Sequence, residues 1–232
     1  MSRHVFPNAD ALAAELVRLT IEAADNAVKA RGLFSMALTG GSAATTLYPV
    51  LAQAKLPWDK VHIFFGDERS VPPEHTDSNY GLADKSFLNR VAIPKANIHR
   101  IKGELPAAEA ATLYEKELAV VGDIIDVVHI GMGPDGHICS LFPGHPLLDE
   151  KTKLVAPILD SPKPPPSRVT LTMPALVKSR ELWFLIAGSN KADAVRAVFT
   201  DDKCDLPAAR ASRLHKNVTW LLDQPAATLL KH

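Results

Sequence analysis

The chain has 232 residues, of which 26 are Lys or Arg and 26 are Asp or Glu, so its formal net charge is zero. This length can bury a sizeable core, and we predict a single α/β domain over residues 1–232. The balanced charge excludes a general attraction for nucleic acid, so an anionic ligand has to meet a local basic cluster.

The cysteines and the apolar runs exclude further classes of protein. Cys139 and Cys204 lie in no C-x-x-C pair, which argues against a disulfide framework and a zinc knuckle. No apolar run reaches membrane-spanning length, and the first 20 residues lack the continuous apolar core of a signal peptide. We therefore expect a cytoplasmic protein with no membrane partner and no nucleic-acid partner.

Helices and strands are predicted to alternate along the chain. In the first helix, leucines and alanines recur at steps of three and four, and Gly32 can end it. Ser42 is placed to cap the second helix, which contains Pro49. Helices are predicted at residues 8–31, 42–54, 82–91, 106–121 and 190–199, with a short one at the C-terminus. Strands are predicted at residues 33–41, 60–68, 97–101, 124–132, 153–158, 167–174, 182–189 and 217–223.

Several of these strands, such as the one at 124–132, are nearly continuous hydrophobic runs. Runs of that kind are typical of strands buried on both faces. The chain therefore predicts an α/β fold, a mainly parallel sheet with helices on both faces. The prolines at 162–166 predict a stiff surface loop.

Gly131, Gly133 and Gly136 spell G-x-G-x-x-G directly after a strand, which is the spacing of a dinucleotide-binding turn. Such a turn also needs a long following helix and a second strand that ends in an acidic residue. Here the prolines and glycine at 143–146 end any helix after about two turns, and no strand ends in an acid at the right distance. The context argues against a nucleotide cofactor.

The same glycine-lined turn carries Asp135 and His137. Histidine exchanges protons near neutral pH, and a neighbouring carboxylate can orient it and stabilise its charged form. The alternative is that Asp135 caps a short helix and that His137 is an ordinary loop residue.

Two more strand ends carry polar groups. The turn at 40–42 can be an anion-binding nest or a plain tight turn, and the charges at 67–69 can be a site or a solvated turn. Because ligands bind at the carboxyl ends of parallel strands, the predicted meeting of these groups with the D-G-H turn at one sheet edge favours a site.

Two cations follow later in the chain. Arg168 begins a predicted strand, and Lys191 lies in the first turn of a predicted helix, where a cation opposes the helix dipole. That placement indicates a use such as phosphate binding, although an ordinary surface lysine is the alternative.

Five stretches hold these groups: LTGGSAATTLYPVL, FFGDERSVPPEHTDSNYGLADKSFL, HIGMGPDGHICSLFPGHP, SRVTLTMPAL and AGSNKADAVRAV. In this order they resemble the glucosamine-6-phosphate isomerase/6-phosphogluconolactonase family, and its lactonase branch in particular. The resemblance covers most of the chain and implies a modified Rossmann-like sheet. It also implies hydrolysis of 6-phospho-D-glucono-1,5-lactone in the oxidative pentose phosphate pathway, with no metal and no cofactor.

The resemblance further implies roles for single residues. His137 matches the acid/base proposed for the family, Asp135 its neighbouring carboxylate, and Asp67 a polar site position. Cys139 stands where the family commonly has alanine. The positions associated with the phosphosugar are Gly40, Gly41, Ser42, Arg69, Arg168 and Lys191.

Three alternatives remain: a glucosamine-6-phosphate deaminase, a metal hydrolase that uses some of the nine histidines, and a non-catalytic sugar-phosphate-binding protein. No H-E-x-x-H is present, which argues against the metal enzyme. The deaminase branch reads D-G-H-I-A-F-N-E-P, and its glutamate falls on Phe142 here, which cannot transfer a proton. We therefore expect a lactone hydrolase whose ligand is a phosphosugar lactone. Separately, we expect a monomer, a state that no motif in the sequence specifies.

Overall fold

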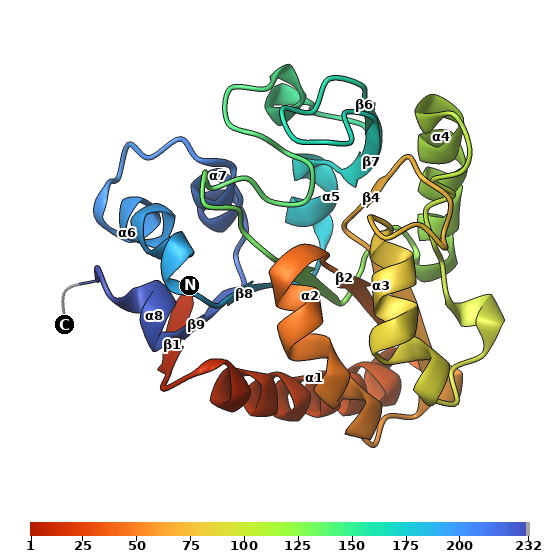
Figure 1. The fold of residues 1–232 in the computed structure, drawn as a ribbon. Helices are drawn as coiled ribbons and strands as arrows, with labels where there is room; N and C mark the ends of the chain where they lie inside the picture. The colour runs from red at the N-terminus through yellow and green to blue at the C-terminus, as the bar shows by residue number, and fades with distance from the viewer. Residues whose placement is uncertain (231–232) are drawn as a thin grey trace.

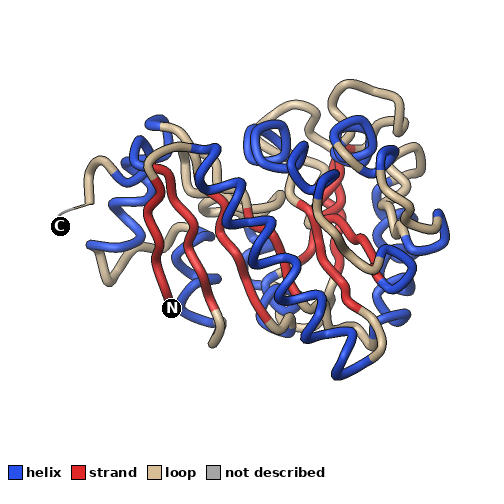
Figure 2. The backbone as a smooth tube through the Cα atoms, turned by 90° about the horizontal axis from the view of Figure 1, so that it is seen from below, coloured by secondary structure: helices blue, strands red, loops and turns tan. Residues whose placement is uncertain are grey.

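A computed structural model describes residues 1–230, in which six parallel strands form the central sheet in the order β1-β9-β8-β5-β2-β3. Helix α1 runs along one face of this sheet, and α5 and α7 lie on the other (Figure 1 and Figure 2). The mainly parallel α/β fold predicted from the sequence is confirmed. The six strands are β1 Ser2–Phe6, β2 Phe34–Leu38, β3 Val61–Phe65, β5 Val127–Ile130, β8 Glu181–Ile186 and β9 Val218–Asp223. The helices are α1 Ala9–Arg31, α2 Gly41–Leu47, α3 Asn79–Ser86, α4 Ala107–Leu118, α5 Met173–Lys178, α6 Ala192–Thr200, α7 Pro207–Leu214 and α8 Gln224–Ala227.

A second, antiparallel sheet consists of β4 Asp67–Arg69, β7 Arg168–Leu171 and β6 Val155–Ile158, with β7 in the middle. Helix α4 packs against this sheet (Figure 1). The sequence did not predict it. The strand expected at 60–68 divides at Gly66, whose N–H donates to Leu38 in the main sheet and whose carbonyl accepts from Leu171 in the second. This one residue joins the two sheets.

Helix α1 follows its prediction closely. The side chain of Asn8 accepts a hydrogen bond from the N–H of Ala11 at 2.9 Å, and Gly32 ends the helix with a φ of +81°. Leu12 and Leu16, both fully buried, lie on the face that packs against the sheet.

Four predicted local features differ from the structure. Ser42 is exposed and caps nothing, because the glycine turn before it already starts α2 at Gly41. The second helix becomes a 3-10 segment at Tyr48–Gln53, since Pro49 lacks an N–H to donate. The strand expected at 97–101 is a single bridge from Ile63 to Ile98. The third helix starts earlier than predicted, at Asn79, because Ser78 caps it.

Among the elements that the sequence did not predict are β1, α5 and α7. Residues 2–6 lack a hydrophobic run and stay mostly exposed at the edge of the sheet, so no apolar pattern marks them as a strand.

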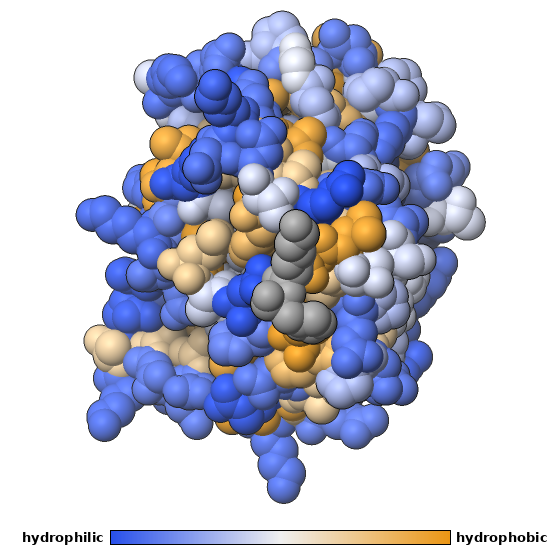
Figure 3. Space-filling view, turned by 90° about the vertical axis from the view of Figure 1, so that its left-hand side faces the viewer, coloured by the Kyte–Doolittle hydropathy of each residue, from blue (hydrophilic) through white to orange (hydrophobic). Residues whose placement is uncertain are grey.

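The surface that carries α6 and α8 is mostly hydrophilic, with hydrophobic residues in small groups (Figure 3). Within residues 1–230, no helix is both long enough and apolar enough to cross a membrane.

The strand order reverses between β2 and β5. From β2 the chain moves outward to β3, whereas β5 lies on the other side of β2 and leads to β8. The loops after β2 and β5 therefore leave the sheet in opposite directions and open a crevice between them.

Asp126 joins three strands at the opposite end of the sheet, just before β5. Its buried carboxylate accepts hydrogen bonds from the N–H and hydroxyl of Ser35, from Arg31 at 2.6 Å and from Arg180 at 3.1 Å. One carboxylate thus sets the start of β5 against the starts of β2 and β8.

We predict that Asp126→Ala lowers the free energy of unfolding by about 2–4 kcal/mol, because it leaves buried donors without an acceptor. Urea denaturation followed by circular dichroism measures the change. Asp193→Ala is the control, since that carboxylate meets Arg196 on the surface and its loss should cost less than about 1 kcal/mol. Equal costs for the two variants would contradict this account of Asp126.

Candidate active site

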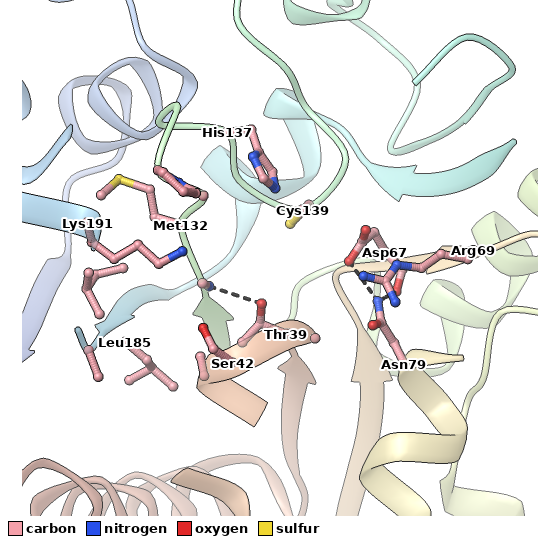
Figure 4. Close-up of a pocket in the computed structure, with 18 of the residues that line it drawn as sticks. Thr39, Ser42, Asp67, Arg69, Asn79, Met132, His137, Cys139, Leu185 and Lys191 are labelled. Atoms are coloured by element: carbon pink, nitrogen blue, oxygen red, sulfur yellow. Dashed lines mark hydrogen bonds between the residues drawn. The ribbon is translucent and has the colours of Figure 1, made fainter. Parts of the chain in front are cut away.

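A cavity opens in the crevice between the carboxyl ends of β2 and β5 (Figure 4). The second sheet and the segment before α6 contribute further side chains to its wall. Asp135, by contrast, lies outside the lining. The predicted site residues that line the cavity are Gly40, Gly41, Ser42, Asp67, Arg69, His137, Arg168 and Lys191. The groups expected to meet at one edge of the sheet are thus brought together.

His137 and Asp135 form a short hydrogen bond. Nδ1 of the imidazole lies 2.6 Å from Oδ1 of Asp135, and the ring extends into the cavity (Figure 4). Residues 137–142 form no helix, so Asp135 is not a helix cap. With Nδ1 held by the carboxylate, Nε2 is the nitrogen left to exchange a proton with a ligand.

Lys163, which the sequence did not single out, completes this cluster. Its Nζ lies 2.9 Å from Oδ2 of Asp135 and 3.1 Å from Nδ1 of His137. Burial alone would raise the pKa of Asp135, but the hydrogen bonds from His137 and Lys163 lower it to about 2. The carboxylate is therefore ionised throughout the neutral range.

The pKa of His137 is lowered from its ordinary value, mainly by burial. Asp135 opposes that effect because it favours the imidazolium, whereas the charge of Lys163 disfavours it. The ring of Phe142 packs 4.9 Å from the imidazole, centre to centre, and contributes to the burial. A neutral imidazole, with a lone pair on Nε2, follows from these surroundings.

Two glycines are required by close contacts rather than by a nucleotide. A Cβ at Gly133 would lie 2.1 Å from the ring of His137, and a Cβ at Gly40 would lie 1.9 Å from Oδ1 of Asn79. The first glycine lets the turn fold back beneath the imidazole. The second lets the β2–α2 turn lie against the start of α3.

Asp67 lies in a buried polar network. Its Oδ2 accepts from the hydroxyl of Ser140 at 2.6 Å, and its Oδ1 accepts from the amide of Asn79 at 3.0 Å. Nη1 of Arg168 lies 4.0 Å from the same carboxylate. This network connects β4, β7 and the loop that carries His137.

The three cations of the cavity have different surroundings. Arg69 donates from Nη1 to the carbonyl of Asp77, but its buried Nε has no partner among the described residues. Arg168 is committed to a neighbouring loop, since its Nε and Nη2 donate to the carbonyls of residues 163–165. Lys191 is 9% exposed, and its pKa is lowered by burial and then by the charge of Lys163. Arg69 and Lys191 are thus less committed to neighbouring carbonyls than Arg168 is.

Glu68 fixes the approach of α3 to this wall. Its buried carboxylate accepts from the N–H groups of Arg69, Asn79 and Tyr80 and from the hydroxyl of Ser78. The sequence marked Glu68 as one charge of a possible site, but the structure uses it to hold the first turn of a helix.

The chain is similar to known proteins of one family. The family model described as glucosamine-6-phosphate isomerases/6-phosphogluconolactonase matches residues 7–220. The chain belongs to this family. Within it, a 6-phosphogluconolactonase of Mycobacterium tuberculosis is 43% identical, with 99% of this chain and 98% of that protein covered. The human 6-phosphogluconolactonase is 42% identical, over 97% of this chain and 92% of that protein. The solved structure of 6-phosphogluconolactonase from Trypanosoma brucei has a TM-score of 0.86 at 29% identity, over 99% of this chain and 98% of that one.

Cys139 lines the cavity close to His137, at a position where the family resemblance implies alanine. Its φ of +49° is uncommon for a residue with a side chain. Burial, aided by the negative charge of Asp67, raises the pKa of its thiol well above the ordinary value. Since the thiolate is the nucleophile, this environment suppresses the reactivity of Cys139.

We predict that Cys139 reacts with iodoacetamide at pH 8 at least about tenfold more slowly in the native protein than in the protein unfolded by guanidinium. A Cys204→Ser variant leaves Cys139 as the only thiol, so mass spectrometry can follow the reaction without ambiguity. A native rate equal to the unfolded rate would show that the reactivity of the Cys139 thiol is not suppressed.

Proposed function

We infer that this chain hydrolyses 6-phospho-D-glucono-1,5-lactone to 6-phospho-D-gluconate, a step of the oxidative pentose phosphate pathway, with His137 as acid/base. The observation that carries this proposal is the imidazole held at Nδ1 by Asp135, at 2.6 Å, in a cavity that also holds cations. A phosphorylated sugar lactone fits both features, because its ester carbonyl can react beside the imidazole and its phosphate can meet the cations. The names of the relatives support the same reaction.

The reaction needs one group that takes a proton and returns it. Nε2 of His137 removes a proton from water as the water oxygen bonds to C1, and the carbonyl electron pair moves onto its oxygen. When that carbonyl forms again, the bond from C1 to the ring oxygen breaks, and Nε2 gives the proton to the ring oxygen. Asp135 keeps Nδ1 protonated and stabilises the imidazolium that exists between the two steps. The products are a carboxylic acid and a hydroxyl group.

We propose that Arg69 and Lys191, with the turn Gly40–Ser42, bind the phosphate and so fix the ring relative to His137. Both side chains line the cavity, and the largely buried ammonium of Lys191 supports this assignment. Arg168, whose guanidinium already serves the neighbouring loop, offers only Nη1 to the cavity. Asp67 acts by positioning the loop of His137 through Ser140.

Phe142 separates this proposal from deamination of glucosamine 6-phosphate. It is 1% exposed and packs on the imidazole at the position where the deaminase branch has a glutamate. A phenyl ring cannot transfer a proton, so His137 lacks the partner that ring opening needs. A binding protein without catalysis, the other alternative, would not need the His137–Asp135 pair.

A cytoplasmic location and a monomeric state stay predictions.

We predict that the chain accelerates hydrolysis of freshly prepared 6-phosphogluconolactone above its spontaneous rate, and that His137→Ala lowers kcat about 10²–10⁴-fold. Acid release at constant pH, in the presence of excess chelator, measures both. Cys139→Ala should keep most of the activity. Ammonia released from glucosamine 6-phosphate at a comparable rate would instead assign the chain to the deaminases.

We predict that D-gluconolactone without the phosphate is a poorer substrate by at least about 100-fold in kcat/KM, because charge-assisted hydrogen bonds to phosphate are strong. The same acid-release assay with the two lactones measures the ratio. Lys191→Met should lose most of this preference and act on both lactones at similar low rates. Equal kcat/KM values of the wild-type protein for the two lactones would contradict the proposed role of the phosphate in substrate binding.

A further inference from the structure

Lys163 belongs to the proline loop at 159–167, and the proposed reaction as described does not use it. It lies outside the residues that line the cavity. Its ammonium nevertheless ends within hydrogen-bond distance of both members of the proton-transfer pair. A flexible lysine that is 39% exposed needs a reason to adopt that position.

The backbone of the loop is built to hold Lys163 in place. Arg168 donates to three consecutive carbonyls, those of Lys163 at 3.1 Å, Pro164 at 2.9 Å and Pro165 at 3.1 Å. The hydroxyl of Ser161 donates to the carbonyl of Lys163 and accepts from its N–H. A buried guanidinium and a serine thus fix the point from which the lysine side chain extends.

The contacts of Asp135 are divided between two donors. Its Oδ1 faces Nδ1 of His137, and its Oδ2 faces Nζ of Lys163. The lysine therefore neutralises part of the charge that would otherwise favour an imidazolium, and it also fixes the carboxylate plane toward Nδ1. Asp135 thus stays ionised and oriented toward His137, while the imidazole is not held permanently in its charged form.

We propose that Lys163 is a positioning residue for the lactonase reaction. Because Lys163 shares Asp135 with His137, it keeps the imidazole neutral and ready to act as a base. The inference rests on the proposed function, and it adds a third member, Lys163, to the His137–Asp135 pair. It also explains Arg168, whose main task is to anchor the lysine loop rather than to bind the substrate.

The charged groups around His137 come from several elements. Asp135 lies on its own loop, Lys163 on the proline loop, Asp67 on β4, Arg168 on β7 and Lys191 before α6. Asp135 and Asp67 raise the pKa of the imidazole and Lys163 lowers it. Arg168 lies over the ring of Phe142, and Lys191 is close enough to Asp135 and Lys163 to interact with both. Removal of Lys163 leaves Asp135 unopposed, so the imidazole should keep its proton to higher pH.

The test compares the pH profiles of kcat/KM for the wild type, Lys163→Met, Lys163→Arg and Asp135→Asn. The acid limb reports protonation of the base in the free enzyme. We expect kcat/KM of Lys163→Met to lie about three- to tenfold below that of the wild type on the acid limb and to approach it on the plateau. KM should be almost unchanged. Lys163→Arg keeps the charge and should restore the profile. Asp135→Asn should move the limb in the opposite direction, to lower pH, on top of a lower plateau.

Titration of the His137 imidazole by NMR in the same variants gives a readout that needs no substrate. Its midpoint should rise in Lys163→Met and return in Lys163→Arg, whereas Lys153→Met, at an exposed lysine, should leave it unchanged. An unchanged midpoint in Lys163→Met overturns the proposal, and so does an equal loss of kcat/KM at every pH. A wild-type protein without lactone hydrolysis overturns the proposed function instead, while the NMR titration still measures the coupling of Lys163 to His137.

Discussion

The hydrogen bond between His137 and Asp135 is the contact on which the arrangement of the site depends. It selects the protonated nitrogen of the ring, and thereby decides that Nε2 carries the lone pair toward the cavity. The turn at 131–137 is shaped around it. Gly133 accommodates the ring, and the N–H of Gly133 donates to the carbonyl of His137 at 2.9 Å, which closes the turn. The glycine spacing that is typical of a nucleotide-binding turn thus forms, in this protein, a tight turn that supports an imidazole.

The second sheet adds a wall of charged side chains to the crevice at the edge of the main sheet. Gly66 passes the chain from the main sheet to β4, and Glu68 then ties β4 to the first turn of α3. Through these links, Asp67 and Arg69 reach the wall of the cavity, where Asp67 contacts the loop of His137. This wall places more protein around the cavity, and electrostatic interactions beside protein are stronger than they would be at an open sheet edge.

The cations in and beside the cavity are not equivalent, although each carries a positive charge. Arg168 has most of its donors directed at loop carbonyls, and Lys163 faces a carboxylate. Arg69 has a buried Nε that meets no partner within residues 1–230. A guanidinium can hold three carbonyls at once, since its donors lie in a rigid plane, whereas an ammonium acts as a compact charge at the end of a flexible chain. Replacement of Arg168 by lysine would therefore lose contacts with the loop carbonyls even though it preserves the charge.

The sequence by itself determined the fold class, the long capped helix α1 and the approximate positions of the central strands, because hydrophobic periodicity and capping residues act over a few neighbouring residues. It also placed the glycine turn, Asp67, Arg69 and His137 at strand ends, where a parallel sheet brings them together. Only the tertiary structure decided that residues 67–69 leave the main sheet, that Arg168 anchors a loop and that Lys163 meets Asp135. These contacts join residues 28 to 103 positions apart, or lie in a loop with no periodic pattern, so no local signal in the sequence marks them.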